Sequence, residues 1–551
     1  MPPTNPPRER LEPIGIDLDR FAWSRPLTTA CLRQFDTVRD LFAGNPRDPQ
    51  AWQSTIKRVQ AAPRDRAAIS GVLTAQLTRR GAHPKAIEAA RALSDQQTVA
   101  IVTGQQAGLF GGPLYTILKA ITAIQLARRV ERDSGVRVVP VFWIEADDHD
   151  WAEVRVAHVL DAEQRLRDLV TPDLPGAGQR PVGDLVLDER AAAIVQELGA
   201  TLPPSAFIAD LTNDLTRCYR PGMGFAEAFA MLLDGWFASY GMVAFEAYAA
   251  DAKPLARDLF VKELSNPGRT ARMVMDAAAR MRQLGHAPQV EPSDDTVALF
   301  YHGPERREAI KLRDQRFAVG SAVRSAGELT SEADAHPERF SANVMLRPLV
   351  QDRLLPTICY VAGPAELAYQ AQLGSVYEAF AVEPPLLMPR VSATLLDSSA
   401  ARFLERHGLS VADLHDLEDL VLKRIVERAL PVGIDEAIAA MQADIDERAP
   451  SLRAAVSGVD PTLGGAVDTT VDRMRDSLKS LHTKIVQATK RNDETLRRQF
   501  QRTYALVYPG GGPQERVLSG VFFQNRYGSE LIPLLLDVLP LDTDQHYVLT
   551  L

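Results

Sequence analysis

The sequence predicts an α/β protein in which a parallel-sheet core is followed by an α-helical coiled-coil domain. Apolar, β-branched runs at residues 98–102 and 136–145 are typical of buried strands, and helix-period apolar residues follow Pro113 between them. A strand, a helix and a second strand within about fifty residues form the right-handed βαβ unit of a parallel sheet. Apolar residues spaced alternately four and three apart from Val467 to Ile485 predict the coiled coil.

The composition is typical of a globular protein that acts on small molecules. The chain has 551 residues, 46% hydrophobic and 24% charged, which is enough for about three or four structural units. Its net charge of −9, with basic and acidic residues interspersed, argues against a nucleic-acid partner. Cys31, Cys218 and Cys359 are far apart and form no metal-ligand pair, as expected for free thiols in a reducing cytosol.

Targeting signals are not recognised in the chain. The start has no apolar leader pattern, and no run of about 18 apolar residues occurs. We therefore expect a cytoplasmic protein without a membrane span and with a frayed, proline-rich N-terminus.

Four segments follow one another along the chain. Residues 1–97 carry helix-period patterns with glycine stops and are expected to be helical. Residues 98–397 form the core, with inserted connecting segments at about 155–330. Residues 398–510 form the helical coiled-coil dimerisation domain, and residues 511–551 return through a glycine turn to a closing helix. Further strands are expected at residues 241–248, 296–301 and 354–363.

A glycine-rich loop joins the first strand of the core to its helix. Gly104, Gly108, Gly111 and Gly112 allow positive φ and close backbone approach, and Pro113 suits the first helical position. Free N–H groups of such a loop and the positive end of the helix dipole make a site for phosphate, carboxylate or another anion. The loop matches neither the dinucleotide fingerprint nor the P-loop.

Acidic residues cluster at the end of the second strand. Glu145, Asp147, Asp148, His149 and Asp150 can supply a general acid or base near neutral pH, because neighbouring carboxylates raise one another's proton affinity and hold a histidine charged. The same groups could bind a divalent ion. On a strand, Asp147 and His149 would share one face and Asp148 and Asp150 the other. The alternative is a loop of solvated helix caps.

Other candidates precede or follow strands that should end at the same sheet edge. The segment at residues 354–373 repeats the opening arrangement of strand, glycine and helix, so the two loops are expected to share one crevice. An arginine is suited to carboxylate recognition, although one beside a proline can be a structural anchor. Two glutamines either hydrogen-bond a ligand or satisfy the loop backbone. The candidate binding residues are Gln105, Gln106, Asn343, Arg347, Gly363, Glu366 and Arg390.

Two long helical stretches are expected in the coiled-coil domain. Residues 411–448 and 466–506 have helical patterns, and residues 449–465 break them. The apolar seam consists of Val467, Val471, Met474, Leu478, Leu481 and Ile485. We expect an antiparallel hairpin whose exposed seam pairs with another subunit; the alternative is a long helix packed on its own domain.

Five motifs resemble a known family. In chain order they are "VTGQQAGLFGGPLYTILKAITAIQLA", "VPVFWIEADDHDWAEV", "SANVMLRPLVQD", "YVAGPAELAYQAQL" and "PRVSATLLD". They look like the cysteine-adding enzyme of bacillithiol biosynthesis, and the likeness extends to the coiled coil and the "PGGGPQERVLSG" turn. The resemblance implies a Rossmann-like core similar to that of class I aminoacyl-tRNA synthetases, inserted connecting segments and a dimerising coiled coil.

The resemblance also implies a reaction. The family joins cysteine to the amine of glucosaminyl malate, the last step of bacillithiol formation, and its members are associated with an adenine nucleotide, ATP or ADP. The sequence assigns no metal-ligand set. An anion site could hold malyl carboxylates or a phosphate, and the acid cluster could bind or deprotonate an ammonium. Two alternatives remain: a nucleotide- or sugar-processing transferase on the same core, and a non-catalytic coiled-coil assembly protein.

Overall fold

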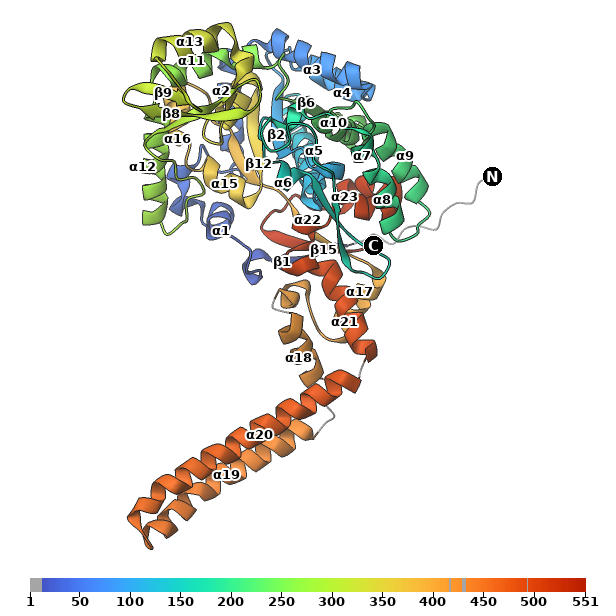
Figure 1. Cartoon of the computed structure of the whole chain (residues 1–551), viewed down its shortest axis with the longest axis vertical. Helices are drawn as coiled ribbons and strands as arrows, with labels where there is room; N and C mark the ends of the chain where they lie inside the picture. Colours follow the sequence, from blue (N-terminus) through green and yellow to red (C-terminus); the bar gives the residue numbers. More distant parts are fainter. Residues whose placement is uncertain (1–11, 416–417, 429–432, 493) are drawn as a thin grey trace. The chain divides into compact units, whose positions relative to one another are not determined.

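The computed structural model describes residues 12–415, 418–428, 433–492 and 494–551 (Figure 1). The proline-rich start lies outside the described residues. The chain divides into two compact units, one formed by residues 1–395 and 512–549 and the other by residues 396–511 and 550–551. Each is considered by itself below.

A five-stranded parallel sheet is the centre of the first unit. Its strand order is β13-β12-β2-β3-β6, and every neighbouring pair is parallel. The register aligns Gln106 at the end of β2 with Glu145 at the end of β3, so the loops after both strands meet at one edge. The strands are β2 (Val99–Gln106), β3 (Val138–Glu145), β6 (Val243–Glu246), β12 (Thr357–Ala362) and β13 (Leu386–Pro389). The predicted α/β class with a parallel core is confirmed.

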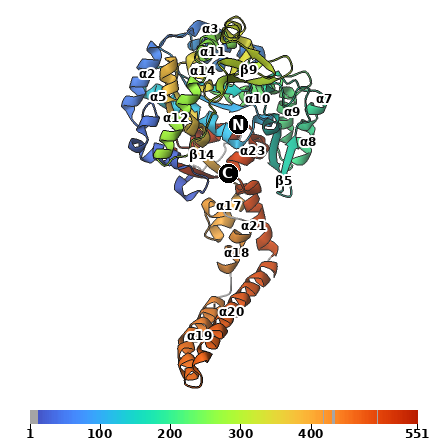
Figure 2. The ribbon, with the colours of Figure 1, turned by 60° about the vertical axis from the view of Figure 1, so that its left-hand side comes forward.

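Helix α5 (Leu114–Ser134) connects β2 with β3 and is buried along most of its length. Pro113 is its N-cap rather than its first helical residue. Helices on either side of the sheet, some far apart in sequence, complete the layers (Figures 1 and 2). They are α1 (Pro26–Arg33), α2 (Pro49–Ala61), α3 (Arg66–Arg80), α4 (Pro84–Ala92), α10 (Phe225–Phe237), α14 (Arg347–Leu354), α15 (Pro364–Gln370) and α16 (Gly374–Phe380).

Residues 155–330 add two antiparallel sheets of their own. One is a β4–β5 hairpin, and the other is a five-stranded sheet in the order β10-β9-β8-β7-β11. The strand expected at residues 296–301 is β7 and belongs to this inserted sheet. The strands are β4 (Val156–Leu160), β5 (Leu166–Val170), β7 (Thr296–His302), β8 (Arg307–Arg313), β9 (Arg316–Val319), β10 (Ala322–Arg324) and β11 (Phe340–Ala342). The helices are α6 (Trp151–Val154), α7 (Glu189–Ala192), α8 (Ile194–Thr201), α9 (Ile208–Cys218), α11 (Arg257–Ser265), α12 (Arg269–Gln283) and α13 (Ala326–Ala335).

The C-terminal segment returns to the first unit. Its helices α22 (Gln514–Val517), α23 (Gly520–Tyr527) and α24 (Leu531–Val538) contact α5. Strand β15 (Gln545–Thr550) lies between β14 (Ser392–Leu396) and β1 (Ile14–Asp17). The segment expected to be all helical at residues 1–97 therefore also contains β1. This strand pairs with residues more than 500 positions away, and a local periodicity cannot reveal that contact.

An antiparallel hairpin of α19 (Ile434–Ser457) and α20 (Gly464–Asn492) dominates the second unit (Figure 2). Ion pairs of Arg475 with Asp446 at 2.7 Å and of Arg453 with Asp468 at 3.1 Å fix its direction. The break expected at residues 449–465 begins too early, because α19 continues through Pro450 and still pairs with α20 beyond it. The remaining helices are α17 (Ser398–Arg406), α18 (Glu418–Arg428) and α21 (Glu494–Val507).

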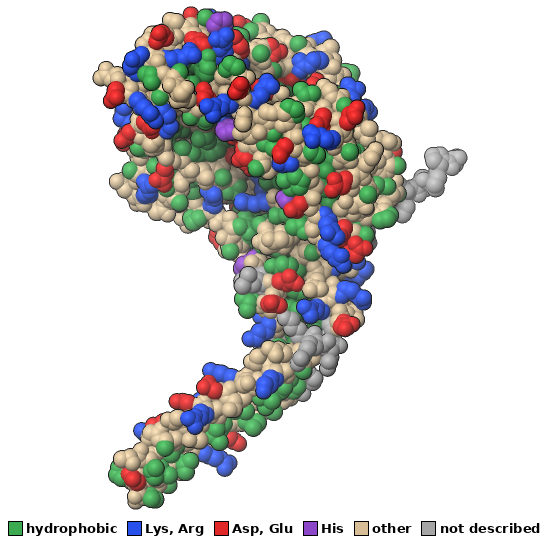
Figure 3. Space-filling view, in the orientation of Figure 1, with side chains coloured by type: hydrophobic (Ala, Val, Ile, Leu, Met, Phe, Trp, Pro, Cys, Tyr) green, Lys and Arg blue, Asp and Glu red, His purple; other side chains and the backbone are tan. Residues whose placement is uncertain are grey.

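The predicted seam of α20 is only partly inside the hairpin. Val467 and Leu478 are buried, whereas Met474 is 51% and Leu481 47% exposed. Apolar side chains therefore remain on the outside of the arm, as the green surface in Figure 3 shows. Within the described residues, no helix is both long and apolar enough to span a membrane.

Candidate functional site

A polar cavity of about 320 Å³ lies at the carboxyl edge of the central sheet. It opens beyond β2, β3 and β12, where ligands bind in open parallel sheets. Eight of the predicted residues line it: Gly104, Gln105, Gln106, Glu145, Arg347, Gly363, Glu366 and Arg390. Tyr115, Lys119, Tyr360, Tyr369 and Arg516 line it as well. The two strand ends that the sequence placed at one crevice therefore do share a cavity.

Lys119 forms one wall of this cavity. Its Nζ donates to Gly104 O at 2.6 Å and to Gln105 Oε1 at 3.0 Å, and it lies 2.6 Å from Glu366 Oε2. A lysine two turns into a helix is ordinarily a solvated surface residue, but this side chain is only 3% exposed. Burial lowers the pKa of Lys119, and the Glu366 carboxylate opposes that shift.

Glu366 links this wall to β12. Its carboxylate accepts from Tyr360 Oη at 2.8 Å and from Gly363 N at 2.6 Å, so it also closes the N-terminus of α15. Lys119 and Glu366 therefore form an ion pair with no net charge on one wall of the cavity.

Glu145 and Arg347 form the opposite wall. Arg347 Nε lies 3.0 Å from Glu145 Oε2, and Trp143 Nε1 donates to the same oxygen at 3.2 Å. Burial raises the pKa of Glu145, Arg347 opposes the shift and Asp147 adds to it. Asn343 does not line the cavity; its carbonyl accepts from Arg347 N at 2.8 Å and so holds the start of α14. Glu145 is thus a buried acid at the base of the site.

Arg390 lines the cavity, and its charge is balanced by the carboxylate of Glu515. Its guanidinium makes a bidentate pair with Glu515, with N–O distances of 2.6 and 2.9 Å. Glu515 also accepts from Ser392 Oγ at 3.0 Å, and Ser392 Oγ lies 2.7 Å from His546 Nδ1. The pKa of Glu515 is lowered to about 2, because Arg390 and the other donors outweigh burial. This network fastens α22 and β15 to the end of β13.

The glycine loop, which the sequence predicted as an anion site, is held in part by hydrogen bonds within the protein. Phe110 N donates to Tyr219 Oη at 2.8 Å, and Gly112 N to Leu109 O at 3.0 Å. A Cβ at Gly111, where φ is +84°, would lie 2.6 Å from the Trp236 ring. Gly108, Gly111 and Gly112 do not line the cavity. The structure gives these glycines a packing role.

Of the predicted acidic cluster only Glu145 lines the cavity; the loop residues Asp147, Asp148, His149 and Asp150 do not line it. Strand β3 ends at Glu145, so the alternation expected for residues 147–150 does not apply. Asp147 turns to Lys253, whose Nζ lies 2.5 Å from Oδ2. Although burial would raise the pKa of Asp147, Lys253 and other cations hold it below its usual value. Asp150 is exposed and caps α6 by accepting from Glu153 N at 3.3 Å.

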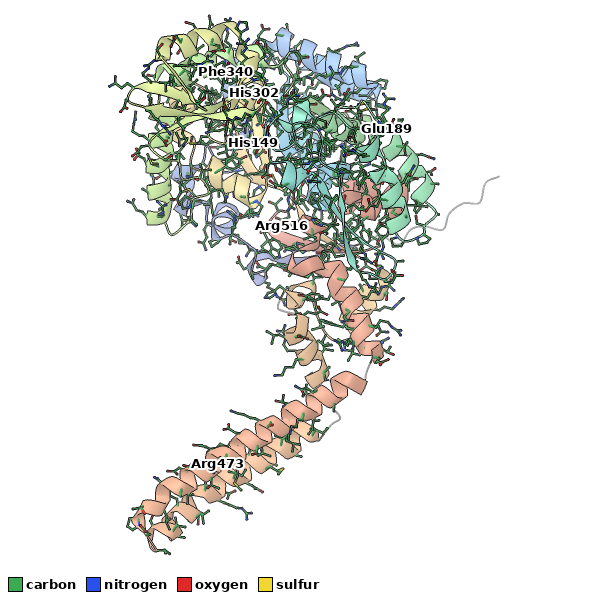
Figure 4. The ribbon with its side chains drawn as sticks, viewed as in Figure 1. His149, Glu189, His302, Phe340, Arg473 and Arg516 are labelled. Atoms are coloured by element: carbon green, nitrogen blue, oxygen red, sulfur yellow. The ribbon has the colours of Figure 1, made fainter. Side chains whose placement is uncertain are left out.

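Asp148 and His149 meet the inserted sheet. Arg307 lies at the start of β8, and its Nη1 is 3.4 Å from Asp148 Oδ1 and 3.5 Å from His149 Nδ1. Its Nε donates to Ser341 Oγ at 3.2 Å, and the same hydroxyl lies 2.7 Å from His302 Nε2. His149 and His302 are labelled in Figure 4. Burial lowers the pKa of His302 to about 4, so this histidine is neutral near pH 7.

Sequence reasoning missed Lys119, Lys253, His302, Arg307 and Arg516. Three of these side chains come from the insertion, and Arg516 follows the core by more than a hundred residues. The only sequence signal for Arg516 was its place in the "PGGGPQERVLSG" turn. In the part of the chain that the structure describes, no group of three or more His, Cys, Asp or Glu residues could hold a metal ion.

Fold and cavity define a Rossmann-like α/β protein with a small-molecule site at the carboxyl edge of its sheet. Two family models match the chain: "Bacillithiol biosynthesis BshC, N-terminal Rossmann-like domain" over residues 16–391 and "Bacillithiol biosynthesis BshC, C-terminal coiled-coil domain" over residues 393–551. The chain therefore belongs to the bacillithiol biosynthesis BshC family. The second match includes residues 512–549, which pack within the first compact unit.

Curated relatives agree over nearly the whole chain, each under the name "Putative cysteine ligase BshC". The protein of Salinibacter ruber is 34% identical over 520 residues, 93% of this chain and 94% of its own. That of Koribacter versatilis is 33% identical, covering 88% of this chain and 90% of its own. That of Geobacillus kaustophilus is 33% identical, covering 90% and 92%.

A solved structure was also matched, titled as a putative arginyl tRNA synthetase from Campylobacter jejuni. The match covers 82% of this chain and 98% of that chain, at 9% identity and a TM-score of 0.23. A likeness this weak carries no argument, so the expected similarity to class I synthetases stays a prediction.

Proposed function

We propose that this protein is the cysteine ligase of bacillithiol biosynthesis, which joins the carboxyl group of L-cysteine to the amine of glucosaminyl malate. The observation that carries the proposal is the match of both domains to one biosynthetic family, together with a charged cavity at the sheet edge. A ligase of this kind needs a site that holds two small polar molecules side by side. A cavity of about 320 Å³ with an open mouth is of the size used for such ligands.

The reaction sets two chemical requirements. The amine nitrogen forms a bond to the carbonyl carbon of cysteine, the bond from that carbon to an activated oxygen breaks, and the amine gives up a proton. ATP would supply the activation by turning the carboxyl oxygen into a leaving group. The arginine and lysine side chains around the cavity fit a phosphate or carboxylate ligand, whereas Gly108, Gly111 and Gly112 of the glycine loop do not line it.

The second requirement is removal of a proton from the substrate ammonium. In our proposal Asp148 and His149 position this group and take its proton. Glu145 holds the reacting end of the substrate in the cavity. The Asp147 N–H donates to Glu145 Oε1 at 3.1 Å. This hydrogen bond ties the loop that carries Asp148 and His149 to Glu145 in the cavity.

We further propose a homodimer formed through the α19–α20 hairpin and a cytoplasmic location. The apolar side chains left outside the hairpin support the dimer. Three free, buried cysteines and small polar substrates support a reducing compartment.

The proposal is tested by incubating the purified full-length protein with cysteine, glucosaminyl malate and ATP. Mass spectrometry should detect bacillithiol, and nucleotide analysis should show whether AMP or ADP is released in equal amount. Omitting ATP should abolish the product. Absence of the thiol product with all three substrates present would refute the proposed reaction.

A further inference from the structure

The charges around the cavity do not balance. Three of its cations are paired with carboxylates: Lys119 with Glu366 at 2.6 Å, Arg347 with Glu145 at 3.0 Å, and Arg390 with Glu515 at 2.6 Å. Each pair is close to neutral. The fourth cation is Arg516, and within the described residues no carboxylate lies within 4 Å of its guanidinium. One positive charge is therefore left over in a partly enclosed site.

The surroundings of Arg516 make this charge unfavourable in the free protein. Burial and then the neighbouring Arg390 lower the pKa of Arg516, while Glu515 opposes them without touching it. The guanidinium lies 5.7 Å from the centroid of the Trp23 ring, which can hold its plane by a cation–π contact. A half-buried arginine kept in place by packing and not by a counter-ion is suited to receive an anion.

Tyr115 faces the same part of the cavity. Its Oη accepts from Gln105 Nε2 at 3.0 Å. Its own O–H has no acceptor within the described part of the chain and can therefore donate to a ligand. Arg390 lies 5.6 Å from the Tyr115 ring centroid, and Tyr115, Arg390 and Arg516 line the same cavity.

We propose that Arg516 and Tyr115 form an oxyanion site that binds a carboxylate or phosphate group of a substrate. This site would hold a substrate of the proposed ligase. Only the identity of the ligand rests on the proposed function. A guanidinium offers two parallel N–H donors to either kind of group, and the phenol adds a third donor. Two sources have this chemistry: a carboxylate of the malyl group and a phosphate of the nucleotide.

The test measures binding, not turnover. Calorimetry with L-malate and, separately, with AMP is carried out on the full-length wild type, Arg516→Gln and Arg516→Lys. Arg132→Gln is the matched control, because Arg132 is exposed on α5 and lies outside the cavity. Near-ultraviolet circular dichroism checks that each variant is folded; Arg516→Lys keeps the charge if Arg516→Gln does not fold.

We expect Arg516→Gln to bind one of the two probes at least about tenfold more weakly, equivalent to about 1.4 kcal/mol. Arg516→Lys should recover part of the loss, since lysine offers the charge without the bidentate geometry. Loss of malate alone assigns the site to a carboxylate, and loss of AMP alone assigns it to a phosphate. The inference is overturned if the wild type binds neither probe, or if Arg516→Gln binds both as Arg132→Gln does.

Failure of the proposed function gives a different result. A wild type that makes no bacillithiol but loses malate or AMP affinity on Arg516→Gln keeps the oxyanion site and loses the ligase assignment. A wild type that makes bacillithiol while Arg516→Gln binds both probes normally keeps the ligase and loses the site.

Discussion

Two acids of the site, only two residues apart, have opposite protonation behaviour. Burial raises the pKa of Glu145, whereas Lys253 at 2.5 Å helps to lower that of Asp147 in spite of its burial. Environments that separate the pKa values of neighbouring acids are typical of sites that move protons. Glu145 is therefore the more readily protonated of the two acids, and Asp147, paired with Lys253, anchors the loop that presents Asp148 and His149.

The first prediction concerns that loop. Asp148→Asn and His149→Asn should each lower kcat for bacillithiol formation by about 10²–10⁴, because a positioned base is worth that much, with little change in KM. Rates measured against pH for the wild type and both variants check it. If His149 takes the proton, the pH profile of His149→Asn should differ from that of the wild type.

The matched control for this prediction is a second histidine–aspartate pair. His158 Nδ1 lies 2.8 Å from Asp168 Oδ1 on the β4–β5 hairpin, exposed and away from the cavity. His158→Asn and Asp168→Asn should leave kcat unchanged. Near-normal turnover in both loop variants, with an unaltered pH profile, would mean that the loop is structural and that Glu145 is the next candidate base.

At the residue level the sequence predicted the acids better than the cations. Acidic residues at the end of a strand can be recognised from the local sequence, because they directly follow a run of apolar residues. The role of Lys119 was hidden, since nothing in a helical pattern shows that Glu366, 247 positions later, lies against it. Local patterns also could not reveal Lys253, Arg307 and Arg516, because segments distant in sequence bring these residues to the site.

The sequence predicted the position of the glycine loop correctly but did not reveal how the loop packs. Strand β2, the loop and α5 lie where the sequence placed them, because all three are encoded by local periodicity and glycine content. The sequence also favoured free N–H groups. Only the packed structure reveals that Tyr219 and Trp236, from distant segments, fill the space around Phe110 and Gly111.

The second prediction follows from this packing. Gly111→Ala should destabilise the first unit by about 2–4 kcal/mol, because a Cβ at φ +84° would meet the Trp236 ring at 2.6 Å. A thermal melt should show the midpoint several degrees lower. Gly71→Ala in α3 is the control, since a Cβ there meets nothing within 4 Å, and helix propensity favours alanine. A midpoint for Gly111→Ala equal to that of the control would contradict the packing role.

Strand pairings were the least predictable elements. β1, β15 and β14 form a sheet whose strands are remote from one another in sequence, and the inserted antiparallel strands are short. No periodicity in the sequence allows the β1–β15 pairing to be inferred. The hydrogen bonds of His546 show what holds β15 in place: Nδ1 lies 2.7 Å from Ser392 Oγ and Nε2 lies 2.8 Å from Thr394 Oγ1.

The third prediction uses this histidine. Burial lowers the pKa of His546 to about 4, against about 6.5 in the unfolded chain. The neutral imidazole therefore contributes stability, on the order of 3 kcal/mol, that is fully present above about pH 6.5 and is lost as pH falls towards about 4. His302 acts in the same direction.

The measurement compares thermal midpoints at pH 7.5 and pH 5. The decrease should be smaller for His546→Gln than for the wild type, because the variant has lost one titrating group. His158→Gln, which replaces an exposed histidine, should keep the wild-type decrease. An identical decrease in all three proteins would show that His546 does not contribute to the pH dependence.

At the scale of the whole molecule, the chain combines a compact α/β unit with a second, helical unit whose hairpin leaves large apolar side chains exposed. Met474 and Leu481 on α20 and Met441 and Leu452 on α19 are each about half exposed or more. Large exposed apolar side chains that gather on a narrow surface mark interaction sites. The heptad spacing that the sequence revealed is real, but the hairpin uses only part of it internally.

The last prediction is that this outer face forms the homodimer. Met474→Glu with Leu481→Glu should convert the dimer to a monomer in light scattering, because four charged side chains would be buried in the dimer contact. The hairpin itself should survive, since both side chains are about half exposed. Leu478→Glu is the contrasting variant: Leu478 is only 7% exposed, so its replacement should lower helicity by circular dichroism as well as disrupt association. Exposed polar Lys479→Glu on the same helix controls for added charge and should remain a dimer. A double variant that stays dimeric at low micromolar concentration, with normal helicity, would show that another surface carries the association.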